Sequence, residues 1–192
     1  MSAIPAALSC CRGISMKTFL TGALALIAIS AIAFAETKSG QTESVTINGK
    51  TITIKYSSPA VNGRAGKIFG KDGLIGGDDN YPVWRAGANA ATALHTDADL
   101  TIGTLAVPKG DYTLFVNLAN PAAWELIVNK QTGQSGLTYD AKQDLGRVKM
   151  TMSKPAAMVE QLKYSLSNTG GNKGKLSLAW ENVEASVPIT VK

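Results

Sequence analysis

Short runs in which every second residue is apolar recur along this chain, and they constrain its fold more than any other feature. In such a run, alternate side chains point to opposite faces of a strand, so one face is buried and the other exposed. No segment keeps a helical period over ten residues; the best helical candidates are the Ala-rich segment 86–94 and a turn after Pro155. The strand-like runs are residues 93–96, 100–107, 112–118, 124–129, 147–152, 159–166, 176–181 and 187–191.

These runs, with short turns between them, predict an all-β fold. We expect an antiparallel β-sandwich of the jelly-roll-like or Greek-key kind, with a closed barrel as the alternative. Pro188 falls inside the last run. Because proline cannot donate to a ladder of backbone hydrogen bonds, it predicts an edge strand there.

A β-hairpin is predicted at the start of the domain. Asn48-Gly49 separates two alternating segments, and this pair favours a two-residue type I′ turn. Such a turn places Val45 opposite Ile52. Turn and hydrophobic pattern then agree, because one face of the hairpin carries Val45, Ile47, Ile52, Ile54 and Tyr56.

The N-terminal 35 residues have the pattern of a cleaved signal peptide. Met16-Lys17 precedes an apolar segment, 18–34, and Ala33-Phe34-Ala35 supplies small residues before an expected cleavage site at Glu36. The apolar segment is shorter than the ~20 residues of a membrane span. We therefore expect a periplasmic or extracellular protein without a membrane anchor after cleavage. Residues 1–15 fit a mis-called start.

The remaining chain is predicted to contain a flexible polar tether, residues 36–44, and a single domain, residues 45–192. Both cysteines, Cys10 and Cys11, precede the cleavage site, so the mature chain would have no disulfide and no thiolate metal ligand. Removing Arg12 and Lys17 from 19 basic residues leaves 17 against 14 acidic ones. This mild excess, without basic runs interleaved with aromatic residues, argues against nucleic-acid binding.

Few residues are available for catalysis. His95 is the only histidine, so a multi-histidine metal site is excluded, and no Gly-x-Ser-x-Gly motif or phosphate-binding glycine loop occurs. Asp72, Asp78, Asp79 and Asn80 offer oxygen ligands but lack the spacing of a calcium loop. We expect no cofactor and no metal. The enzymatic alternative is a hydrolase that uses carboxylates such as Asp144 or Glu181, assisted by His95.

Arginines beside glycines and aromatic residues are the sharper feature. A guanidinium in apolar surroundings needs acceptors, and its planar fork suits carboxylates, phosphates or sugar hydroxyls. The predicted role is therefore binding of a small polar or anionic ligand, or a carbohydrate-like component of the cell envelope. Alternatively, Arg85 or Arg147 pairs with Asp144 within a purely structural envelope module. The candidate ligand-binding residues are Arg64, Trp84, Arg85, Asn89, Asp144 and Arg147.

The same residues carry a resemblance to the bacterial domain-of-unknown-function family 2911. Its most distinctive block is similar to Val83-Trp84-Arg85-Ala86-Gly87-Ala88-Asn89-Ala90-Ala91-Thr92, although the family often has Thr and Glu where this chain has Ala86 and Ala90. The resemblance implies an exported bacterial protein with a β-sandwich fold and no assigned activity. Further similar blocks are Asn62-Gly63-Arg64, Ile68-Phe69-Gly70, Pro108-Lys109-Gly110-Asp111-Tyr112, Trp124-Glu125-Leu126-Ile127-Val128-Asn129 and Leu178-Ala179-Trp180-Glu181-Asn182.

Overall fold

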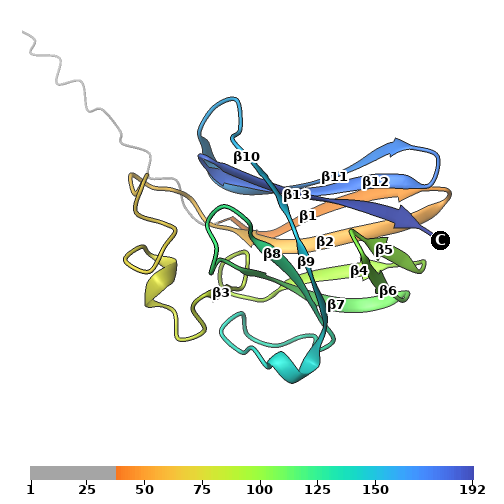
Figure 1. Cartoon of the computed structure of the whole chain (residues 1–192), viewed down its shortest axis with the longest axis horizontal. Helices are drawn as coiled ribbons and strands as arrows, with labels where there is room; N and C mark the ends of the chain where they lie inside the picture. Colours follow the sequence, from red (N-terminus) through yellow and green to blue (C-terminus); the bar gives the residue numbers. More distant parts are fainter. Residues whose placement is uncertain (1–37) are drawn as a thin grey trace, which may run out of the picture. The chain divides into compact units, whose positions relative to one another are not determined.

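A computed structural model of the protein describes residues 38–192, which form two antiparallel β-sheets (Figure 1). The first sheet has the order β1-β2-β4-β7-β8-β9, with β3 also paired to β7; the second has the order β11-β12-β13-β5-β6, with β10 also paired to β13. Each sheet begins and ends with a different strand, so the predicted β-sandwich is confirmed and the barrel alternative is wrong. The strands are β1 (Lys38–Ile47), β2 (Lys50–Ser58), β3 (Val83–Trp84), β4 (Thr92–Thr96), β5 (Leu100–Ile102), β6 (Leu105–Val107), β7 (Gly110–Asn117), β8 (Glu125–Asn129), β9 (Asp144–Lys149), β10 (Thr151–Ser153), β11 (Val159–Gly170), β12 (Lys173–Glu181) and β13 (Val183–Val191).

The predicted hairpin is present in the predicted register. Val45 lies opposite Ile52 in the β1–β2 pair, and Asn48 and Gly49 both have positive φ, 50° and 70°. These values are those of a type I′ turn, whose twist matches that of the flanking strands. Ile47, Ile52 and Ile54 are accordingly buried.

The prediction of a flexible tether over residues 36–44 was wrong for its described part. β1 begins at Lys38, and Gln41 and Glu43 lie opposite Tyr56 and Ile54 of β2. Polar side chains are tolerated there because β1 is an edge strand with an exposed outer face, and its backbone is held by the ladder with β2. Residues 36 and 37, and the predicted signal peptide over residues 1–35, lie outside the described residues.

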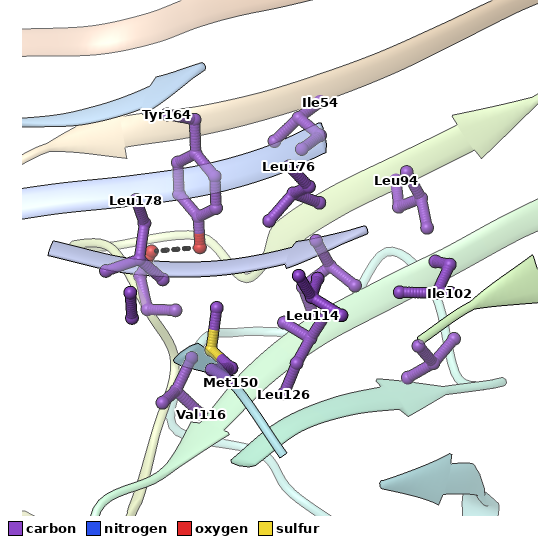
Figure 2. Packing of buried hydrophobic residues seen from close by; sticks show 14 of the residues in the cluster. Ile54, Leu94, Ile102, Leu114, Val116, Leu126, Met150, Tyr164, Leu176 and Leu178 are labelled. Atoms are coloured by element: carbon purple, nitrogen blue, oxygen red, sulfur yellow. Dashed lines mark hydrogen bonds between the residues drawn. The ribbon is translucent and has the colours of Figure 1, made fainter. Parts of the chain in front are cut away.

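Two of the predicted runs are divided in the structure. The run 100–107 is a hairpin of β5 and β6. The run 147–152 passes from one sheet to the other: β9 pairs with β8, whereas β10 pairs with β13. Buried Met150 lies at this crossing, and alternation continues through it because the side chain faces the shared core (Figure 2).

The predicted edge strand at Pro188 was also wrong, because β13 lies inside its sheet. On one side β13 pairs with β12 throughout; on the other it pairs first with β10 and then with β5. Pro188 lies in the gap between these two partners, and its carbonyl accepts a hydrogen bond from the Gly103 N–H at 2.8 Å. A residue's N and C=O point to the same side of a strand, so the missing N–H falls where no ladder partner needs it.

The core fills the space between the sheets. Leu94, Leu114 and Leu126 come from the first sheet, and Leu176 and Leu178 from the second (Figure 2). The Ala-rich segment 86–94, predicted as the best helical candidate, contains no helix and leads into β4. Among residues 38–192, the only helical elements are two 3-10 turns, η1 (Ile75–Gly77) and η2 (Ala141–Gln143). No helix in this range is long and apolar enough to cross a membrane.

Candidate functional site

The segment after β3 is held in an unusual conformation at one end of the sandwich. Ala86 and Asn89 both have positive φ, 50° and 58°, a region that non-glycine residues seldom occupy. The Ala86 carbonyl accepts hydrogen bonds from Thr92 Oγ1 at 3.1 Å and from the Tyr164 hydroxyl at 3.0 Å. Figure 2 includes the bond from Tyr164, which ties this segment to the opposite sheet. The backbone around Arg85 is therefore fixed from two directions.

Aromatic side chains from both sheets meet beside this segment. Trp84 of β3 stacks on Trp180 of β12, with ring centroids 5.7 Å apart and planes 17° apart. Phe69, from the loop between β2 and β3, makes an edge contact with each of these rings. The cluster gives the end of the sandwich a rigid, buried wall.

The loop between β2 and β3 closes this end and places Asp78. Leu74 and Ile75 donate backbone hydrogen bonds to the carbonyls of Lys67 and Ile68, at 2.9 and 3.1 Å. Burial of Ile68 and Ile75 holds this pairing against the core. The 3-10 turn η1 follows, and the Asp78 N–H donates to the Ile75 carbonyl at 3.0 Å. The carboxylate of Asp78 is thereby directed toward Arg85.

A cavity of about 220 Å³ lies between this loop, the segment after β3 and Trp180. Because its lining residues come from segments far apart in the sequence, no single sequence motif predicts the cavity. The residues that line it are Pro59, Arg64, Leu74, Ile75, Asp78, Trp84, Arg85, Gly87, Ala88 and Trp180.

Residues that line the cavity carry buried polar atoms that have no protein partner. Within the described chain, four buried side-chain polar atoms lack a hydrogen bond, and three belong to lining residues: Asp78 Oδ1, Arg85 Nε and Trp180 Nε1. Trp180 is only 1% exposed. A buried polar group without a partner costs about 1–3 kcal/mol, so its occurrence requires an explanation. Three of these four atoms belong to residues around one cavity, so the explanation has to be sought there.

Arg85 and Asp78 oppose each other at the edge of the cavity. Arg85 Nη1 lies 3.6 Å from Asp78 Oδ2, longer than a hydrogen bond, and the side chains are 25% and 12% exposed. Gly136 packs under Arg85: a Cβ added there would lie 2.5 Å from Arg85 Cδ. The two opposite charges largely cancel, while Arg85 Nε and Asp78 Oδ1 keep unused hydrogen-bonding capacity.

Of the six predicted site residues, Arg64, Trp84 and Arg85 line the cavity and the other three do not. Arg64 donates from Nε to the Val61 carbonyl at 3.0 Å and from Nη2 to the Ala60 carbonyl at 2.9 Å. It therefore shapes the loop as well as lining the cavity. Asn89 is exposed, and its carbonyl accepts from the Gly136 N–H at 3.2 Å.

Asp144 and Arg147 form a separate network at the start of β9. Arg147 Nη2 lies 3.0 Å from Asp144 Oδ2 and donates to the Tyr139 hydroxyl at 2.7 Å. Asn129 Nδ2 donates to Asp144 Oδ1 at 2.9 Å. Burial and the hydrogen bond to Asp144 raise the pKa of Tyr139 to about 12, so it remains a neutral donor. The alternative that Arg147 pairs with Asp144 is confirmed, whereas Arg85 pairs with Asp78 instead.

The residues of the hydrolase alternative are dispersed. Glu181 is buried, and its Oε1 accepts a hydrogen bond from the Gly66 N–H. His95 lies on the exposed face of β4, with Nδ1 2.8 Å from Asp111 and Nε2 3.1 Å from Asp97. Neither Asp144, Glu181 nor His95 lines the cavity. No group of three or more His, Asp or Glu side chains in residues 38–192 is placed to hold a metal ion.

Seven of the ten lining residues were not among the predicted site residues, and Asp78 and Trp180 are the two of these that carry unpartnered polar atoms. Trp180 has the signature of a core strand position, since alternation from Leu176 already explains it. Asp78 attracted attention only as an oxygen ligand in a glycine-rich loop. No sequence pattern identifies either residue as part of the site. Their unpartnered atoms can be recognised only in the folded structure, where β12 and the loop lie beside Arg85.

Comparison with known proteins gives a family and nothing finer. A family model described as "Protein of unknown function (DUF2911)" matches residues 38–189. No curated protein matches the chain. No solved structure matches it either.

Proposed function

We propose that this chain, which belongs to the DUF2911 family of proteins of unknown function, is a β-sandwich module that binds a small polar ligand. The ligand occupies the cavity beside Arg85. The protein is exported through the signal peptide over residues 1–35, and the ligand is a component of the cell envelope or its surroundings.

One observation carries this proposal: three of the four unpartnered buried polar atoms among residues 38–192 belong to residues that line one cavity. A fold that only needed stability would satisfy or replace these groups. The positive φ of Ala86 agrees with this view, because strained backbone is retained where the surrounding structure demands it.

The charges around the cavity favour a narrower class of ligand than the arginines alone suggest. Arg85 faces Asp78, and Arg64 is occupied by two carbonyls of its own loop. An anion would lie close to the Asp78 carboxylate, so a neutral polar ligand, or one that carries both charges, fits better than a simple anion.

Binding can be tested by thermal unfolding against a library of sugars, amino acids, organic acids and nucleosides, followed by calorimetry with each compound that raises Tm. Arg85→Lys keeps the positive charge but removes the Nε donor. A hydrogen bond to a charged group contributes about 1.5–3 kcal/mol. We therefore expect roughly ten- to hundredfold weaker binding of the selected compound.

Arg147→Lys is the matched control. It makes the same chemical change in the network with Asp144 and Tyr139, outside the cavity. It should leave the dissociation constant unchanged and lower stability by about 1 kcal/mol, through lost hydrogen bonds. Equal effects of the two substitutions on binding, or no stabilising compound in any class, would contradict the proposal.

A further inference from the structure

A second hollow adjoins the cavity and shares three of its residues. This outer groove, about 320 Å³, is lined by Leu74, Asp78 and Arg85, which also line the cavity, and by Gly77, Asp79 and Leu137. The Asp78–Arg85 pair therefore lies between an inner compartment, which Trp84 and Trp180 close, and an outer groove.

The unpartnered atoms of the residues that line the inner compartment suit a group that both accepts and donates hydrogen bonds. Arg85 Nε and Trp180 Nε1 are donors, whereas Asp78 Oδ1 is an acceptor. A carboxylate or phosphate could accept from the two donors but would leave Asp78 facing another negative group. Hydroxyl groups can satisfy all three atoms without disturbing the Arg85–Asp78 pair, because each hydroxyl donates once and accepts.

Volume limits how much of a ligand the inner compartment can take. Pockets for drug-sized ligands are usually about 300–1,000 Å³, and this compartment has about 220 Å³. One ring with its hydroxyls is the largest unit that suits it. A longer ligand must enter by its end, because Trp84 and Trp180 close the compartment at its far side.

Two exposed leucines line the outer groove. In residues 38–192 the large hydrophobic side chains that are exposed are Leu74 (49%), Leu137 (57%) and Met158 (49%), and the two leucines both line the outer groove. The Asn80 side-chain amide donates to the Leu137 carbonyl at 2.6 Å and fixes this wall to the loop that carries Asp78. The groove thus offers apolar contacts to whatever follows the unit inside.

We propose that the site recognises the end of an oligosaccharide: the terminal sugar enters the inner compartment and the next sugar lies in the outer groove between Leu74 and Leu137. This inference rests on the proposed function and specifies its ligand class. The hydroxyls of the terminal sugar bond to Arg85, Asp78 and Trp180. The less polar face of the second sugar contacts the leucines.

The test measures binding of glucose, galactose, mannose and N-acetylglucosamine, and of disaccharides and trisaccharides that end in each, by calorimetry on the full chain. For the preferred terminal sugar we expect the disaccharide to bind about tenfold more tightly than the monosaccharide, through the apolar area it buries in the groove. The trisaccharide should add little, because a groove of about 320 Å³ has room for about one further sugar.

Leu137→Ser should remove most of this gain while leaving monosaccharide affinity unchanged, since Leu137 lines only the groove. Met158→Ser is the matched control: a similarly exposed side chain outside the groove is removed, and neither affinity should change.

The outcomes separate this inference from the proposed function. Equal affinities for monosaccharide and disaccharide, or no effect of Leu137→Ser on the disaccharide, would overturn end-on recognition while sugar binding stands. Binding of amino acids or other polar compounds in place of sugars would overturn the sugar assignment and leave a small polar ligand. Binding of no compound in any class would overturn both.

Discussion

His95 shows how neighbouring carboxylates favour the charged form of a single exposed side chain. Its two ring nitrogens lie 2.8 and 3.1 Å from the carboxylates of Asp111 and Asp97. A neutral imidazole has one N–H and can satisfy only one of them, whereas the protonated ring donates to both. The hydrogen bond with Asp111, followed by that with Asp97, raises the pKa of His95 above its ordinary value near 6.5. His95 and Asp111 line a separate surface hollow of about 380 Å³, and Lys55 adds a positive charge to its lining.

The raised pKa predicts a pH dependence of stability. A group whose pKa is higher in the folded state stabilises the fold fully below the unfolded-state pKa, and this contribution is lost as pH rises through the folded-state pKa. The free energy of unfolding should therefore fall slightly from pH 6 toward the alkaline side of the folded-state pKa. His95→Gln should abolish this change. NMR titration of the single histidine measures its pKa directly, and a value at or below 6.5 would contradict the assignment.

At the residue scale, the candidate site could be predicted only in part. Arg147 and Asp144 are three residues apart in sequence, so their pairing was a natural alternative from the sequence. Arg85 and Asp78 are brought together by the 3-10 turn η1 and the segment after β3. Their separation in the sequence does not predict this contact. The unused atoms of Trp180 and Asp78 depend on packing between sheets, which alternation along one strand does not reveal.

At the element scale, the β1–β2 hairpin depends on its turn. Gly49 has φ +70°, and a Cβ added there would meet no atom within 4 Å. Gly49→Ala therefore tests backbone conformation alone. A left-handed residue with a Cβ costs about 1–2 kcal/mol, and we expect a loss of stability of that size in urea unfolding.

Gly77→Ala supplies the matched comparison for the hairpin. Gly77 also has open space around its Cβ position, but its φ lies outside the positive range. Stability should stay unchanged or rise by up to about 1 kcal/mol, because alanine restricts the unfolded chain. Equal losses from Gly49→Ala and Gly77→Ala would show that the turn does not depend on a left-handed residue.

The elements that were predicted correctly are those determined by a few residues close together in the sequence. The Asn48-Gly49 turn and the alternating strands follow from backbone preference and from one buried face. The start of β1 at Lys38, the change of sheet at Met150 and the place of Pro188 inside its sheet have non-local causes. Each depends on which strand lies alongside. Polar residues or proline are tolerated where that strand needs no apolar contact or backbone hydrogen bond from them.

At the scale of the whole molecule, no disulfide holds the two described sheets together. The described residues contain no cysteine, since Cys10 and Cys11 are the only two in the chain. The sandwich therefore relies on its buried core, including Trp84 and Trp180 stacked between the sheets. The part of the chain that the structure describes thus has no thiol that could oxidise and no disulfide to form.

Export leads to a prediction about the mature chain as a whole. If the segment ending in Ala33-Phe34-Ala35 is a cleaved signal peptide, intact-mass measurement of the secreted or periplasmic protein should find a chain that begins at Glu36. Thiol titration of the same sample should find no free thiol, and a reductant should leave Tm unchanged. Ala35→Asp places a large charged residue where the peptidase needs a small one, so a longer, uncleaved species should accumulate. A dominant wild-type species that keeps residues 1–35 and both cysteines would contradict the export prediction, whatever ligand the cavity binds.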